Sequence, residues 1–235
     1  IGLLHIEKLE GNSEKLSAFK EASNNAVVSE SILGEKLSKK DKKAKQKAEL
    51  SDEQVTSLCA SVVEKSEFKK QLLDEINSDT TELDRFKAWG SVAIEDFDYL
   101  KSKGIQLKMF EVPADKYSQI DGTIDTILVN NDKKTIRFLV LNSGEGRPEK
   151  LLPEAFEVPL PRMSTKQLEE EVANDKAKIQ EIEAFFAENA KYVFAIKKFR
   201  INLESDIEFE NVNAGMEHES EGNVNDLAWI SGYVP

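Results

Sequence analysis

The sequence predicts an α+β protein in which two small α/β lobes are joined by a long antiparallel helical hairpin, a coiled-coil rod. Residues 52–88 and 165–210 each carry one apolar stripe at spacings of mostly three and four, which is typical of helices that pack on each other. The segment between them reads as short helices and strands. At 1.5 Å per residue the two helices measure roughly 55 and 70 Å, too long for a compact globule.

This pattern divides the 235 residues into four parts. We expect an incomplete proximal lobe from 1–11 with 213–235, an outbound helical segment at 12–90, a distal α/β lobe at 91–161 and a long return helix at 162–212.

The first part opens as a strand. Residues 1–9 begin apolar and then alternate, and Glu10-Gly11 supplies a turn. From Asn12 the spacing becomes helical until Gly34 interrupts it. The face expected to be buried comprises Leu16, Phe19, Val27 and Leu33.

Residues 36–47 are rich in lysine. A surface for anionic lipid or nucleic acid needs an apolar face or interleaved aromatic residues, and this segment has neither. A solvated helix tip or a mobile loop is the better interpretation.

The first long helix has a clear start, because Ser51 and Gln54 can cap each other's backbone amides. It continues to Trp89 and stops at Gly90. Its predicted stripe comprises Val55, Leu58, Val62, Phe68, Leu72, Ile76, Leu83 and Phe86.

The return helix starts with the same reciprocal arrangement, a capping box, formed by Ser164 and Gln167. Its stripe has polar gaps near Asp175 and Asn189. The apolar members are Leu168, Val172, Ile179, Ile182, Phe186, Val193, Ile196 and Leu203.

The distal lobe should contain helices and strands in alternation, followed by a proline-rich loop at 142–161 with an extended piece at 155–160. After the return helix we expect a loop at 213–225 and a final strand at 226–234 that pairs with the first. In chain order, the lobe comprises a helix at 94–103, a strand at 105–112, a short helix at 114–120, and strands at 125–130 and 135–141.

Composition excludes several functions. The net charge of −12 disfavours a general nucleic-acid binder, which needs cationic surface. No stretch approaches the roughly 20 apolar residues that cross a bilayer. The chain begins at Ile1 without methionine, so we interpret it as a fragment of a longer protein.

No catalytic, cofactor-binding or metal site is predicted. Residues 144–150 resemble a phosphate loop but fail its spacing. His5 and His218 form no triad. Cys59 lies near the helical seam, where a small core residue is more probable than a nucleophile.

The acidic and aromatic residues also have ordinary interpretations. Carboxylates such as Asp96 and Asp98 or those at 169–171 fit a solvated helix face. Trp89 and Trp229 fit lobe cores better than docking positions.

The junctions between these elements resemble subunit I, also called subunit a, of the V-type rotary ATPases. LLHI at 3–6 is similar to the family's first strand, and FKAWG at 86–90 with FDYLKSKGI at 97–105 to its entry into the distal lobe. VPLP at 158–161 resembles the entry to the return helix, and ISGYVP at 230–235 the closing strand.

The resemblance covers essentially the whole chain as the N-terminal cytoplasmic domain of that subunit. It departs at Tyr233, where the family usually has tryptophan, and in the absence of the strand and helix that precede LLHI. The membrane half, with the arginine used in ion passage, is also absent.

The resemblance implies a non-catalytic stator at the cytoplasmic face of the membrane. It implies that the lobes bind the peripheral stalk, an E/G-type heterodimer, and the central-stalk cap, a C/d-type subunit, while the rod resists rotor torque beside the rotor ring. The alternative is a coiled-coil adaptor protein of another assembly.

Overall fold

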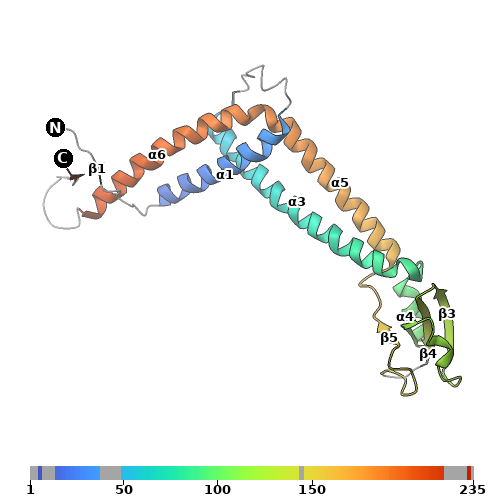
Figure 1. Cartoon of the computed structure of the whole chain (residues 1–235). Coiled ribbons are helices and arrows are strands. Elements are labelled where there is room, and N and C mark those ends of the chain that lie inside the picture. Colours follow the sequence, from blue (N-terminus) through green and yellow to red (C-terminus); the bar gives the residue numbers. More distant parts are fainter. Residues whose placement is uncertain (1–4, 7–13, 38–48, 143–145, 220–231, 234–235) are drawn as a thin grey trace. The chain divides into compact units, whose positions relative to one another are not determined.

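The structure is a computed structural model that describes residues 5–6, 14–37, 49–142, 146–219 and 232–233 (Figure 1). It confirms an α+β fold with long helices and one small sheet. The chain forms two compact units: unit 1 comprises Ile1–Lys70 and Ile179–Pro235, and unit 2 comprises Gln71–Lys178. Most of the lysine-rich segment, Trp229 and most of the predicted final strand lie outside the described residues.

Unit 1 is built from helices and one short strand pair. α1 is Glu14–Lys36 and α6 is Val193–Glu219, while α3 (Asp52–Phe86) and α5 (Thr165–Asn189) contribute residues to both units. Strand β1, His5–Ile6, pairs antiparallel with β6, Gly232–Tyr233. The predicted pairing of the first and last strands is therefore confirmed.

Within unit 1, α1 packs along α6 (Figure 1). Buried Leu16 and Leu33 of α1 supply apolar contact area, and two ion pairs join the helices, Lys15 with Glu210 and Glu30 with Arg200, each at 3.0 Å. The second half of the return stripe thus has α1 as a partner, which the sequence analysis did not foresee.

Two residues expected on buried faces are exposed, Val27 and Phe68. On α1 the inward positions are Ala26, Ser29 and Leu33, and Val27 lies about 100° around the helix from Ala26. Gly34 does not interrupt α1, which continues to Lys36.

At Phe68 the inward position belongs to the next residue, Lys69. Its ammonium pairs with Glu183 of α5, which also binds Lys36 of α1. These two lysines, Lys36 first, lower the pKa of Glu183.

The return helix is not continuous as predicted. α5 ends at Asn189, and a 3₁₀ turn, η3 (Ala190–Tyr192), separates it from α6. The Asn189 amide donates to the Phe185 carbonyl at 2.8 Å, and such local side-chain bonds compete with the helical backbone ladder. Beyond the predicted end, α6 continues through 213–219, because the single Gly215 costs only about 1 kcal/mol in a helix.

The first capping box is confirmed and the second is confirmed in half. The Ser51 amide donates to Gln54 Oε1 at 3.0 Å, and the Gln54 amide donates to Ser51 Oγ at 3.3 Å. At α5 the Ser164 amide donates to Gln167 Oε1 at 3.1 Å. Ser164 Oγ instead accepts from the Ile94 amide at 3.2 Å and donates to Glu95, whose pKa this bond lowers.

Unit 2 contains a four-stranded antiparallel sheet in the order β3-β4-β2-β5. The predicted strand 135–141 coincides with β4, and the other strands agree to within a few residues. The expected short helix at 114–120 is one 3₁₀ turn, η2. The elements are η1 (Lys87–Trp89), α4 (Ile94–Ser102), β2 (Leu107–Pro113), η2 (Tyr117–Gln119), β3 (Thr126–Asn131), β4 (Thr135–Leu141) and β5 (Phe156–Val158).

Candidate docking surface

The sheet of unit 2 is apolar on both faces. On one face Phe110 stacks on Phe138 with ring centroids 6.0 Å apart, and Tyr117 meets Phe138 edge-on at 5.4 Å. On the other face Met109 packs with Trp89 and Val92. A sheet covered on both faces is a rigid support for side chains at its edges.

The sheet is tied to the helix ends of the same unit. The Asn130 amide of β3 donates to the Ala88 carbonyl at 2.8 Å, directly after α3. The Thr165 amide at the start of α5 donates to the Val92 carbonyl at 2.9 Å, and the Val92 amide donates back to Thr165 Oγ1 at 3.1 Å. The sheet is therefore joined to the end of α3 by a hydrogen bond, and to the start of α5 through Val92, which packs on Met109.

Large apolar side chains are exposed on several elements of unit 2, and we call this set the lobe surface. Exposed aromatic and aliphatic residues beside a rigid sheet are typical of protein contact sites. The set comprises Tyr99, Ile105, Ile127, Leu128, Val129, Phe156 and Leu160.

A second feature of unit 2 is a polar cavity of about 610 Å³. The Asp79 side chain, only 4% exposed, accepts from Arg162 at 2.7 Å, and Arg162 also binds Glu171 at 2.8 Å. The hydrogen bond that Arg162 donates to Asp79 raises the pKa of Arg162. The lining residues are Glu75, Ser78, Asp79, Arg162, Glu171, Asn174, Asp175 and Lys178.

This cavity was missed in the sequence analysis. Asp79 lies three residues after Ile76 and four before Leu83, on the face of the predicted stripe. This spacing is the signal that could have placed its side chain inward. The sequence pattern shows Asp175 only as a polar gap in the apolar stripe of the return helix. In the structure Asp175 is buried and pairs with Lys178 at 2.7 Å.

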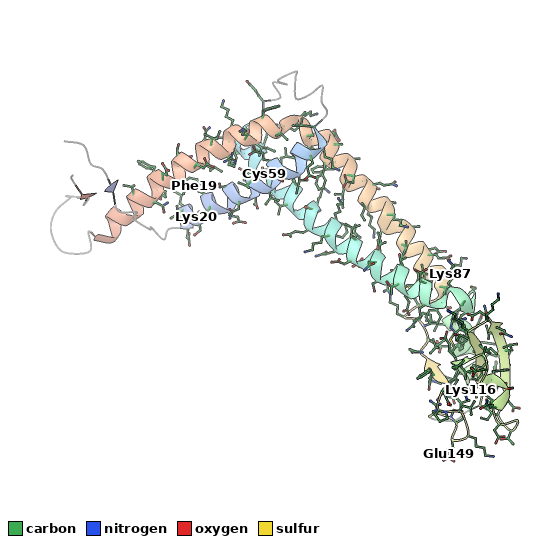
Figure 2. The ribbon with its side chains drawn as sticks, in the orientation of Figure 1. Phe19, Lys20, Cys59, Lys87, Lys116 and Glu149 are labelled. Carbon is green, nitrogen blue, oxygen red and sulfur yellow. The ribbon has the colours of Figure 1, made fainter. Side chains whose placement is uncertain are left out.

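The residues considered for chemistry are not brought together. Cys59 of α3 is buried in unit 1, its carbonyl accepts from Ser29 Oγ at 3.2 Å, and burial raises the pKa of its thiol (Figure 2). Trp89 is buried in the core of unit 2, as predicted. His218 falls in α6 rather than in a loop.

The carboxylates behave largely as surface residues. Asp96, Asp98, Glu169 and Glu170 are exposed, and Glu171 is partly buried beside Arg162. Among the described residues no group of acidic, histidine or cysteine side chains has metal-binding geometry. None of the described helices is long and apolar enough to cross a bilayer.

Among the described residues, the turn between β3 and β4 contains the carboxyl group with the most strongly shifted pKa. Asp132 accepts from Arg137 at 2.8 Å and from the amides of Lys134 and Thr135 at 2.9 and 2.8 Å. These bonds, Arg137 first, lower the pKa of Asp132 from 3.8 to about 2.

This pKa shift predicts that Asp132 makes an acid-sensitive contribution to the folding stability of unit 2. Because the pKa is lower in the folded state, the contribution is present above about pH 4 and is lost as the pH falls toward 2. Asp132→Asn should lower the urea midpoint of unit 2 at pH 7, and the difference from wild type should vanish near pH 2. A difference independent of pH would contradict this assignment.

Comparison with known proteins gives a distant similarity. No family model matches the chain. An alignment of 178 residues, covering 70% of this chain, is 26% identical to V-type ATP synthase subunit I 1 of Treponema pallidum (strain Nichols), and it covers 28% of that protein. The chain thus spans less than a third of the length of the relative. It is distantly similar to subunit I of a V-type ATP synthase, in agreement with the resemblance that its junction motifs indicate.

Proposed function

We propose that this chain is a non-catalytic stator domain of a V-type ATPase or ATP synthase. The observation that carries the proposal is the similarity to subunit I 1 over 70% of the chain. In this proposal the chain lies at the cytoplasmic face of the membrane and links peripheral stalks to the sector that translocates ions.

The structure offers physical support for a role in linkage. Such a part must transmit force between partners without reacting, so it needs stiff helices and firmly attached contact surfaces. The hydrogen bond from Asn130 attaches the sheet to the segment that follows α3, and the hydrogen bond from Thr165 attaches the start of α5 to Val92, which packs against the sheet. In the proposal α3 and α5 form the antiparallel hairpin, with 91–161 as the distal lobe and 1–11 with 213–235 as part of the proximal lobe.

The proposed partners are an E/G-type peripheral stalk heterodimer and a C/d-type central-stalk cap. The lobe surface gives the distal lobe apolar side chains for such contacts, with Phe156 the most exposed at 68%.

A pull-down with the stalk heterodimer tests the assignment of the distal lobe. We expect the whole chain to retain the heterodimer and a variant lacking 91–161 to lose it. As a matched control, Val27→Ala changes an exposed apolar residue of unit 1 and should retain binding. Binding by the deletion variant would exclude the distal lobe as the stalk contact.

If the whole chain fails to bind any rotary ATPase subunit, the adaptor alternative gains support. A gene neighbourhood without rotary ATPase subunits would favour it in the same way.

A further inference from the structure

The two edge strands of the unit 2 sheet differ in how well they are protected against pairing with a further β-strand. β5 has only three residues, contains Glu157 and is followed by Pro159 and Pro161. Short length, charge and proline are devices that keep an edge strand from pairing. β3 has six residues and contains neither charge nor proline, so its protection is limited to the register irregularity at Val129.

β3 also exposes apolar side chains along its length. Ile127, Leu128 and Val129 are 46%, 51% and 39% exposed. Ile127 lies opposite Leu139 and Leu128 opposite Phe138, so these two belong to opposite faces of the sheet. A partner at this edge must therefore be apolar on both of its own faces.

The backbone specifies the secondary structure of that partner. The Leu141 amide donates to the Asp125 carbonyl at 3.0 Å, so Asp125 and, two residues on, Ile127 direct their backbone groups toward β4. The backbone groups of Thr126 and Leu128 consequently point away from β4, at the open edge. Unpaired amides and carbonyls in a row are satisfied by another β-strand.

Charges at the two ends of β3 favour a particular strand. Asp125 precedes β3, and Lys133 and Lys134 follow Asp132 after it, all exposed. If a second β3 ran antiparallel about a twofold axis near Leu128, the Asp125 of each copy would lie near the 132–134 turn of the other. In that turn Arg137 pairs with Asp132, so Lys133 and Lys134 leave a net positive charge. A second copy thus provides an uncharged strand, apolar on both faces, with complementary ends.

We propose that two copies of this chain pair through β3 to form a continuous eight-stranded antiparallel sheet. This interaction goes beyond the proposed stator role and does not depend on it, and it uses only the β3 part of the lobe surface, Ile127, Leu128 and Val129. Val129, the extra residue at the β3–β4 register shift, limits the new ladder to a short segment, so the dimer is expected to be weak and dependent on concentration.

Analytical ultracentrifugation of the whole chain, from micromolar to millimolar concentration, tests this proposal. Wild type should shift from 26.4 kDa toward twice that mass. Leu128→Lys should raise the dimer dissociation constant by about tenfold or more, because it places two like charges near the axis. Leu128→Pro should also weaken the dimer, because it removes an outward amide and leaves the bonds to β4.

Phe156→Lys is the matched control, since it makes the same kind of change at the opposite edge. It should leave the dissociation constant unchanged, and circular dichroism should show that all three variants fold. A wild type that stays monomeric throughout would overturn the proposal. So would a dimer that neither Leu128 variant weakens, or that Phe156→Lys weakens equally.

Discussion

Phe138→Ala is expected to destabilise unit 2 by about 3–5 kcal/mol. The ring is fully buried, stacks on Phe110 and makes a T-shaped contact with Tyr117, so its removal leaves a cavity in the centre of one sheet face. Since domains are typically stable by only about 5–15 kcal/mol, much of the stability of unit 2 should be lost. Urea unfolding followed by Trp89 fluorescence, in a Trp229→Phe background, measures this change.

Phe156→Ala is the control for that substitution, because the Phe156 side chain is mostly exposed. Its effect should stay within about 0.5 kcal/mol. A cost below about 1 kcal/mol for Phe138→Ala would mean that this face does not hold the sheet together.

Arg162→Met should cost about 2–3 kcal/mol. It leaves Asp79, almost fully buried, without its cationic partner. Breaking a fully buried pair costs about 3–5 kcal/mol, and we expect less here because Arg162 is 54% exposed and water can reach the site. The same fluorescence assay of unit 2 measures the change.

Two further variants separate charge burial from the loss of a surface contact. Glu171→Gln removes the half-exposed partner of Arg162 and should cost less than about 1 kcal/mol. Asp79→Leu combined with Arg162→Met removes both members of the buried pair and should recover most of the loss. Equal costs for Arg162→Met and Glu171→Gln would contradict a dominant role for Asp79.

The fold was predictable where local chemistry determines it. The Ser51 box, the strand at 135–141 and the stop at Gly90, whose φ is 79°, depend on neighbours in sequence. The return stripe is also confirmed, since its inward residues from Leu168 to Leu203 are buried or partly buried.

The predictions failed where a residue distant in the sequence determines the position of a side chain. Ser164 Oγ binds the 94–95 segment, so its capping bond is redirected by tertiary contact. Lys69 replaces Phe68 as the inward residue because Glu183 is available on another helix. Asp79 is buried because Arg162, 83 residues later, neutralises it, and sequence spacing contains no sign of such a pairing.

The pairing of His5–Ile6 with Gly232–Tyr233 bears on how tolerant the chain is of insertions. The chain between the two strands starts and ends at the same strand pair, so it forms one large closed loop. The entropy of closing a flexible loop rises only with the logarithm of its length, about 0.6 kcal/mol for each doubling. Segments added within flexible parts of this loop should therefore change the stability of the strand pair very little, and the chain can vary in length there without separating the two strands.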